Sequence, residues 1–231
     1  MTDHDGQEAN AGRHDLRQQG SEAVSGARDT REAVRDAVVR ALSSKPLDEG
    51  QVRDVVKTIL KGVLDAAPDE GAESADALKQ AAAGIDEALE RAAMASKLAI
   101  EEARSQAAAF SESDLRRALD DLATMERWYL ETLGAVVKEG TKTSAHILAD
   151  LADHLHRTGT RTGDAVRDAL ADLGRAQPIH VAPRPSDVVH TARAGAATIA
   201  AIGSGILAGL ADALGTQPGE SRKEPPENDA G

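Results

Sequence analysis

Residues 194–211 read AGAATIAAIGSGILAGLA, a stretch with no charged side chain that lies between Arg193 and Asp212. A helix that is apolar on every side must be buried in protein or in lipid. The rest of the chain is rich in alanine and in charged residues with helical periodicity. The sequence therefore predicts an all-α protein: long amphipathic helices in an extended helical bundle, with a separate C-terminal apolar helix and disordered termini.

Three interpretations of this stretch remain open. Its eighteen residues are at the lower edge of what crosses a bilayer core. The five large aliphatic residues contribute only about −1.5 to −3 kcal/mol to insertion, at roughly −0.3 to −0.6 kcal/mol each. Four glycines and two hydroxyl residues oppose insertion. The stretch is thus a helix buried in protein, a helix lying on a hydrophobic surface, or a membrane span.

The stretch has two sides when it is drawn as a helix. One side carries the large aliphatic residues Ile199, Ile202, Ile206 and Leu210. The other side carries small residues at every fourth position, namely Ala197, Ala201, Gly205 and Gly209. Rows of small residues let helix backbones approach closely, above all in membranes. We expect these eight residues to contact a hydrophobic surface or another helix.

The composition predicts a thin core. Phe110, Trp128 and Tyr129 are the only aromatic residues, about 1% of the 231 residues. Aromatic side chains supply much of the buried area of a compact core. With few of them, burial depends on alanine, leucine, valine and isoleucine. We therefore expect a homo-oligomer, or adsorption to a granule or membrane surface, to supply further burial.

The charge and the cysteine count exclude several classes of function. The formal net charge is −12, whereas nucleic-acid binding needs a concentrated basic face. The absence of cysteine excludes disulfides, thiolate zinc sites and thiol nucleophiles. The acidic N-terminal residues lack the apolar core of a signal peptide. We expect a cytoplasmic protein, either free or associated with a granule or membrane, with no nucleic-acid partner and no small-molecule substrate.

The chain divides into five segments. Residues 1–28 are polar and interrupted by glycine, which predicts disorder or weak helix. Residues 29–174 form the predicted bundle, and residues 175–186 form a Pro-rich linker. Residues 187–215 form the apolar helix, and residues 216–231 form a disordered tail.

Within the bundle, capping residues predict where the helices begin. Asp29 and Asp48 precede two short helices, which we expect to form an antiparallel hairpin. An Ala-rich helix then runs from about residue 72 to residue 109. A long helix starts at the capping box of Ser111 and Asp114 and is weakened at Gly134 and Gly140. Residues 157–163 predict a break before the last helix of the bundle. The Ala-rich helix has an inward stripe of Leu78, Ala82, Ile85, Leu89, Ala92, Ala99 and Ala103.

Other candidate chemistry is sparse. His146, Asp150, Asp153 and His154 could face a metal ion. However, the chain lacks the paired Glu-x-x-His motifs of di-metal bundles, so a solvated face is favoured. The adjacent Trp128 and Tyr129 are either an interfacial anchor or, as we favour, a wedge in the core. We expect no catalytic residues, no metal and no cofactor.

One motif is rejected on its context. Gly203 and Gly205 imitate part of the Gly-rich dinucleotide fingerprint. That fingerprint works only after a strand and within a βαβ unit. Only a short tail follows it in this chain, with no room for the second strand.

Three segments carry a family resemblance. They are PLDEGQVRDVVKTILKGV (46–63), GIDEALERAAMASKLAIEEA (84–103) and FSESDLRRALDDLATMERWYLETL (110–133). With them the chain resembles Ala-rich helical proteins of high-GC bacteria that are grouped as domains of unknown function. Across residues 30–174 it is also similar, in composition and long helices, to phasins, which coat polyhydroxyalkanoate granules. The resemblance implies attachment to a hydrophobic surface and transfers no functional residue.

Our leading hypothesis is a non-enzymatic helical protein that associates with a storage granule or membrane, or with itself. The first alternative is a soluble cytoplasmic oligomer, or scaffold, whose last helix completes the bundle. The second alternative is a membrane-inserting, pore-like protein assembled through the glycine row.

Overall fold

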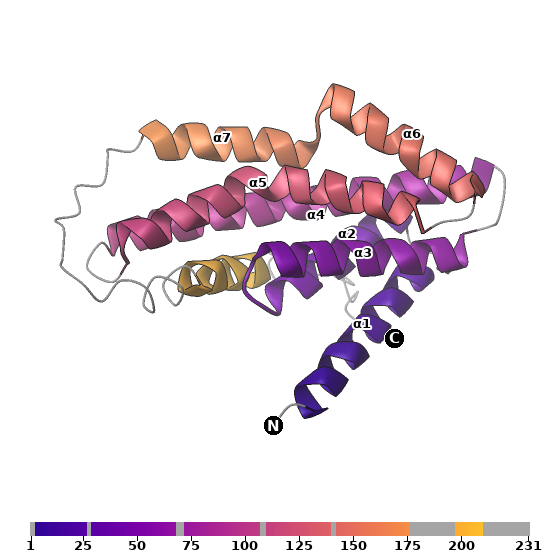
Figure 1. Ribbon diagram of the computed structural model, residues 1–231, viewed down its shortest axis with the longest axis horizontal. Coiled ribbons are helices and arrows are strands. Elements are labelled where there is room, and N and C mark those ends of the chain that lie inside the picture. The colour runs from indigo at the N-terminus through magenta and orange to yellow at the C-terminus, as the bar shows by residue number, and fades with distance from the viewer. Residues whose placement is uncertain are drawn as a thin grey trace, which may run out of the picture.

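The computed structural model describes residues 3–26, 29–67, 72–106, 110–139, 142–175 and 197–209. Within these ranges the regular structure is entirely helical, so the all-α prediction is confirmed (Figure 1). The helices are α1 (Asp3–Ser25), α2 (Thr30–Ser43), α3 (Glu49–Ala66), α4 (Ala72–Ser105), α5 (Glu112–Val137), α6 (Lys142–Thr158), α7 (Arg161–Arg175) and a helix of residues 197–209. Together they form an elongated bundle, from which the N-terminal half of α1 projects (Figure 1).

Three of the predicted helix starts are confirmed by their caps. The carboxylate of Asp29 accepts a hydrogen bond from the backbone N–H of Arg31, and that of Asp48 accepts one from the N–H of Gln51. Ser111 and Asp114 form the predicted capping box at the start of α5. Each cap satisfies backbone donors that the first helical turn leaves without a partner. These starts are therefore local consequences of the sequence.

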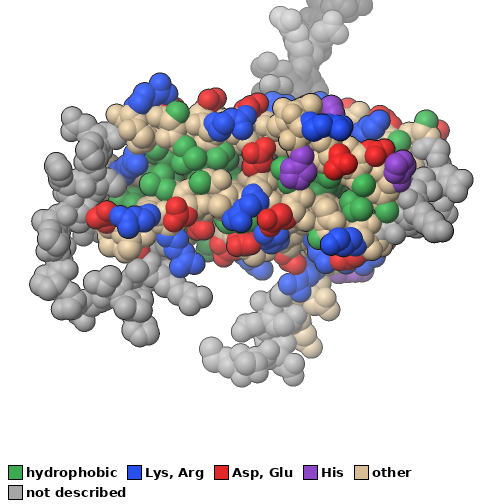
Figure 2. All heavy atoms as spheres, turned by 45° about the horizontal axis from the view of Figure 1, so that its top comes forward, with side chains coloured by type: hydrophobic (Ala, Val, Ile, Leu, Met, Phe, Trp, Pro, Cys, Tyr) green, Lys and Arg blue, Asp and Glu red, His purple; other side chains and the backbone are tan. Residues whose placement is uncertain are grey.

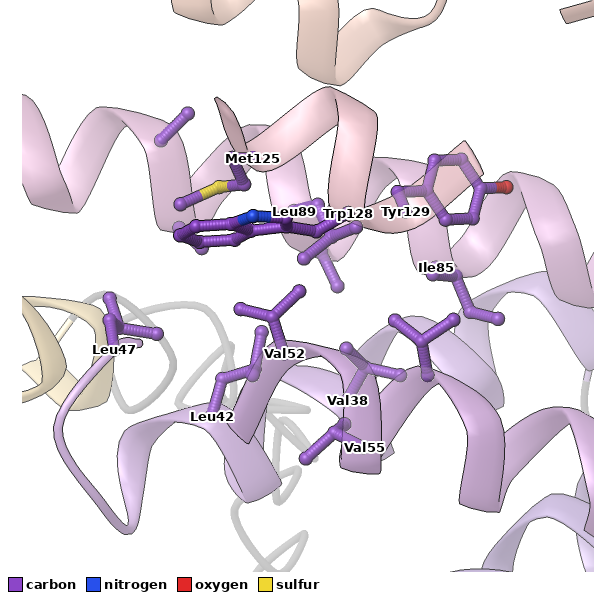
Figure 3. Close-up of a cluster of buried hydrophobic side chains, with 14 of the residues drawn as sticks. Val38, Leu42, Leu47, Val52, Val55, Ile85, Leu89, Met125, Trp128 and Tyr129 are labelled. Atoms are coloured by element: carbon purple, nitrogen blue, oxygen red, sulfur yellow. The ribbon is translucent and has the colours of Figure 1, made fainter. Parts of the chain in front are cut away.

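Helix α4 is the centre of the bundle and packs mainly on α2, α5 and α7. Its predicted inward stripe is confirmed, because every member of that stripe is buried. Many of the buried α4 side chains are alanines, which allow neighbouring helices to approach closely. Larger side chains fill the space where α4 and α5 meet α2 and α3 (Figure 3). The labelled cluster contains Val38, Leu42, Leu47, Val52, Val55, Ile85, Leu89, Met125, Trp128 and Tyr129.

Helices α2 and α3, the predicted hairpin, contact each other, but neither packs mainly on the other. Helix α2 packs mainly on α4, and α3 packs mainly on α1 and α5. Glycines at the crossings explain this arrangement, because they let backbones touch. A Cβ atom on Gly84 of α4 would overlap the carbonyl oxygen of Arg31 in α2. A Cβ atom on Gly62 of α3 would overlap the carbonyl oxygen of Arg17 in α1.

The expectation of disorder or weak helix over residues 1–28 is corrected by α1. This helix packs on α3 and buries Leu16 and Ala23. At its surface, Arg13 bonds the carboxylate of Asp54 at 2.9 Å. Most side chains of α1 are polar or charged, so its packing depends on a partner that is distant in the sequence.

Two predicted helix lengths also differ from the structure. Helix α4 ends at Ser105 rather than near Ala109. The long helix after Ser111 is divided, since α5 ends at Val137 and α6 begins at Lys142. The predicted break at residues 157–163 is confirmed by Gly159, whose φ of 82° ends α6 before α7 begins.

Helix α7 is held at its start by acidic residues of α4. The buried carboxylate of Asp86 accepts hydrogen bonds from the backbone N–H groups of Arg161 and Thr162, at 2.9 and 3.0 Å. Beside it, the side chain of Arg161 bonds Glu87 at 2.6 Å and Glu90 at 2.9 Å. A carboxylate at a helix N-terminus satisfies free N–H groups and complements the helix dipole. The interaction therefore anchors α7 to α4.

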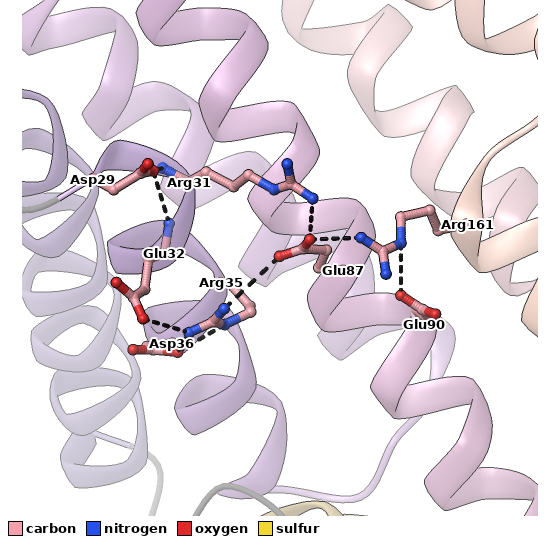
Figure 4. A network of polar contacts seen from close by, with 8 residues as sticks. All are labelled: Asp29, Arg31, Glu32, Arg35, Asp36, Glu87, Glu90 and Arg161. Atoms are coloured by element: carbon pink, nitrogen blue, oxygen red, sulfur yellow. Dashed lines mark hydrogen bonds and ion pairs between the residues drawn. The ribbon is translucent and has the colours of Figure 1, made fainter. Parts of the chain in front are cut away.

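The same carboxylate of Glu87 also connects α4 to α2 (Figure 4). Arg31 of α2 bonds Glu87, and Arg35 lies 3.9 Å from its second oxygen. Glu87 is thus shared by cations from two helices that flank α4. The i,i+4 spacing of Glu87 and Arg91 predicts a pair within α4, and these tertiary contacts replace it.

Candidate functional site: the C-terminal helix and the surface beneath it

Residues 197–209 lie against the bundle rather than apart from it. Ile199 and Leu207 are 2% and 0% exposed and belong to the common hydrophobic core. Gly203 lies between them on the same side, and a Cβ atom there would be 3.7 Å from the Cβ of Ala99 in α4. The helix therefore covers an apolar surface of the bundle instead of forming a separate unit.

Two hydrogen bonds connect this helix to the segment between α2 and α3. The backbone N–H of Leu47 donates to the carbonyl oxygen of Ala200 at 3.4 Å. The hydroxyl of Ser204 donates to the carbonyl oxygen of Lys45 and lies 3.0 Å from the carbonyl oxygen of Ala200. Both bonds satisfy backbone carbonyls with partners far away in the sequence. They give the docked helix a defined position along the bundle.

A small space remains under the helix. Its volume of about 20 Å³ is room for roughly one water molecule. It is lined by Leu47, Ser96, Ile100, Ala118, Asp121, Leu122, Met125, Trp128, Ile199 and Ala200. The lining is mostly apolar, so it offers no arrangement suited to binding a polar small molecule.

The aromatic pair lies in the core beside this space. Trp128 and Tyr129 are 3% and 0% exposed, which confirms the wedge interpretation over an interfacial anchor. The Tyr129 hydroxyl donates to the carbonyl oxygen of Ala82 at 3.0 Å. Burial raises the pKa of the Tyr129 phenol, and the nearby Asp86 carboxylate raises it further. Tyr129 is therefore a neutral structural hydrogen-bond donor.

The structure separates seven of the eight predicted contact residues into two groups. Toward the bundle, Ile199 is buried, and Ile202 and Ile206 are half-buried and packed on the core. The small residues Ala197, Ala201, Gly205 and Gly209 are exposed. Leu210 lies outside the described residues. The predicted division between a large and a small side agrees with this arrangement.

Leu207 and Ser204 were not among the predicted contact residues. Both are buried, and they lie on the same side as Ile199. The helical period could have identified Leu207, because it follows Ile199 by eight residues, slightly more than two helical turns, and so lies on the same side of the helix. Nothing local marks Ser204, since its acceptor Lys45 is 159 residues away.

Asp121 of α5 is the ionisable residue in the lining of this space. Burial raises the pKa of its carboxyl above the ordinary value of 3.8, while Arg117 lowers it. Further carboxylates raise it, namely Asp48, Asp120 and Glu49. Ionised Asp121 therefore opposes docking of residues 197–209, because the docked helix removes water from around the carboxylate.

We expect Asp121→Asn to strengthen docking of residues 197–209 at neutral pH. In the native protein, the part of this pKa rise that burial by residues 197–209 causes weakens docking as the pH rises from 3.8 through the raised pKa, because the docked state then binds the proton more tightly than the undocked state. Amide exchange of residues 197–209 at pH 7 should slow by less than about tenfold, as the shift of a half-exposed group is modest. Unchanged exchange, or a pH dependence equal to that of the parent, would contradict this expectation.

Two further predictions concern metal and membrane sites. His146 and Asp150 lie 3.5 Å apart on α6, and their side chains are 78% and 69% exposed. Within the described residues, no group of three or more His, Asp or Glu side chains could hold a metal ion. In the same residues, no helix combines the length and the apolar character that a membrane crossing requires.

This geometry defines an all-α helical bundle whose core is completed by a docked C-terminal helix. The chain belongs to a family of unknown function, DUF6781, whose model matches residues 6–216. Comparisons with curated proteins and with solved structures find no match. The family thus includes both the bundle and the C-terminal helix, and the resemblance to a domain of unknown function is confirmed.

Proposed function

We propose that this is a non-enzymatic helical protein that attaches reversibly to a hydrophobic surface, such as a storage granule or a membrane, through its C-terminal helix. In the free protein, residues 197–209 pack on the bundle. In the attached protein, the same apolar side lies on the external surface. The observation that carries the proposal is the docking of an uncharged helix on the bundle through its apolar side, with Ile199 and Leu207 buried in the common core.

The docked and the attached positions of the helix bury the same apolar side. Burial of Ile199 and Leu207 contributes about 3–6 kcal/mol, at roughly 1.5–3 kcal/mol for each aliphatic side chain. The helix is ordered in both positions, so the entropy cost of fixing its backbone largely cancels when the two are compared. An external apolar surface offers comparable burial to Ile199, Ile202 and Ile206. A modest difference in free energy therefore decides between the two positions.

Self-association is a second candidate function, and the exposed small side of the helix favours it. A Cβ atom added to Gly205 or Gly209 would meet no described atom within 4 Å. Glycine inside a helix costs about 0.5–1 kcal/mol relative to alanine. Packing within the described chain does not require glycine at these positions, whereas close approach of a second helix would.

A reversible disulfide tests release directly. The chain has no cysteine, and the Cβ positions of residues 99 and 203 are 3.7 Å apart, close to the mean of about 3.8 Å for disulfides. We expect Ala99→Cys/Gly203→Cys to bind phosphatidylcholine vesicles and polyhydroxybutyrate particles at least about tenfold more weakly when oxidised than when reduced. Co-sedimentation measures the bound fraction.

Gly203→Cys alone, treated with the same oxidant, is the matched control and should bind equally in both states. Equal binding of the oxidised and reduced double variant would refute release of the helix. Deletion of residues 187–231 separates the two candidates. Loss of vesicle binding with an unchanged oligomeric state supports surface attachment, whereas loss of an oligomer in sedimentation supports self-association.

A further inference from the structure

A second apolar surface lies between α4 and α7, outside the area that residues 197–209 cover. Met94 and Leu98 are 54% and 45% exposed and are one helical turn apart on α4; among the described residues they are the exposed large hydrophobic side chains. Ala165 and Ala169 of α7 line the same groove, whose volume is about 470 Å³. Figure 2 shows hydrophobic side chains gathered at the α7 end of the face that α6 and α7 form, bordered by charged side chains.

The α7 border of this groove is acidic. Asp164, Asp168 and Asp172 recur at every fourth position and line the groove. Among the described residues, Asp168 has no ion-pair partner, and Asp164 pairs with Arg167 on its own helix. The row from Asp164 to Asp172 spans about 12 Å, at 1.5 Å per residue.

The basic residues in the lining are already paired. Lys97 bonds Asp172 at 2.6 Å, and Arg161 bonds Glu90 at 2.9 Å. The four lining carboxylates therefore exceed the two lining cations. Arg167 and Arg175, outside the lining, also pair with Asp164 and Asp172, so among the described lining carboxylates Asp168 is the one left without an ion-pair partner. The net charge of the whole chain is −12.

We propose that this groove binds a basic amphipathic helix of a partner protein. The aliphatic side of that helix packs on Met94 and Leu98, and its lysine or arginine side chains reach Asp164 and Asp168. This is the helix-in-groove mode of recognition, in which apolar anchors recur along one helix face. A methionine at the centre suits such a surface, because its flexible side chain adapts to the partner. Complementary charge selects this partner over a second copy of the chain, which brings the same acidic row.

The test uses a fluorescein-labelled Leu/Lys amphipathic peptide of roughly 14 residues, about four helical turns. Its affinity for the full-length protein is measured by fluorescence anisotropy. A Leu/Glu peptide with the same apolar side is the matched ligand control. We expect Met94→Gln/Leu98→Gln to weaken binding of the Leu/Lys peptide by at least about tenfold. Asp164→Asn/Asp168→Asn should weaken it about threefold to tenfold.

Glu112→Gln/Asp120→Asn removes the same charge from exposed positions of α5 and controls for general attraction to an acidic protein. We expect less than about a twofold effect, because these positions lie outside the groove. The proposal is overturned if the native protein does not bind the Leu/Lys peptide, or if Met94→Gln/Leu98→Gln binds it unchanged. It is also overturned if the Leu/Glu peptide binds equally well. A native dimer that dissociates in the Met94→Gln/Leu98→Gln variant would assign the groove to self-association instead.

Discussion

Gly84→Ala is expected to destabilise the protein by about 3 kcal/mol, because overpacking of a close contact typically costs 1–3 kcal/mol. Gly84 follows three alanines in α4, so alanine is otherwise well suited to this stretch. The added Cβ atom would overlap the backbone carbonyl of Arg31 and lie 3.1 Å from the backbone nitrogen of Arg35. Backbone cannot move aside as a flexible side chain can, so α2 must shift from α4. Thermal unfolding should show a midpoint lowered by roughly 6–12 °C.

Gly134→Ala is the matched control, because Gly134 lies within α5 and a Cβ atom there meets no described atom within 4 Å. It is expected to stabilise the protein by about 0.5–1 kcal/mol through helix propensity. The contrast separates the crossing from a general effect of glycine replacement. A melting temperature for Gly84→Ala equal to or above that of the parent would show that α2 and α4 do not cross as described.

Asp86→Ala is expected to detach α7 and to cost about 3–5 kcal/mol, since several buried donors lose a charged acceptor. The carboxylate accepts from the N–H of Arg161 at 2.9 Å, from the N–H of Thr162 at 3.0 Å and from the Thr162 hydroxyl at 2.7 Å. Thr162 is 0% exposed, so water does not replace the lost acceptor while α7 stays docked. Amide exchange in residues 161–175 should therefore accelerate far more than exchange in α2.

Asp86→Asn keeps the shape of the side chain and one acceptor oxygen, and should lose clearly less stability than Asp86→Ala. Unchanged exchange of α7 amides in Asp86→Ala would mean that apolar packing of Val166, Ala169 and Leu173 is enough to hold the helix. Equal losses in both variants would point to the charge rather than to the hydrogen bonds.

The docked C-terminal helix and the groove between α4 and α7 are on different parts of the bundle and make separate predictions. The first surface is lined by Trp128 and Met125 beneath residues 197–209. The second is lined by Met94 and Leu98 between α4 and α7. Variants of one surface are therefore controls for the other.

Part of the candidate site was predictable from the sequence. The two sides of the C-terminal helix follow from its period, because residues four apart share a side of any helix. The burial of Trp128 and Tyr129 was also expected, since they are the bulkiest side chains available to an Ala-rich bundle. The partners of these residues were not predictable. Leu47 and Lys45 are remote in the sequence, and nothing near them marks a contact with residues 197–209.

The local features follow from the amino-acid sequence alone: the all-α class, the helix starts at Asp29, Asp48 and Ser111, and the inward stripe of α4. These features depend on residues within one or two helical turns of each other, whose periodicity and capping can be recognised in a short stretch of sequence. Which helices are neighbours becomes apparent only in the folded chain. Gly62 allows the close crossing of α3 with α1, and Gly84 allows that of α4 with α2. Asp86 of α4 holds the start of α7. Each of these contacts needs a second segment that is distant in the sequence and close only after folding. The docking of the C-terminal helix likewise could not be predicted, because the surface on which it packs is formed by segments that come together only on folding.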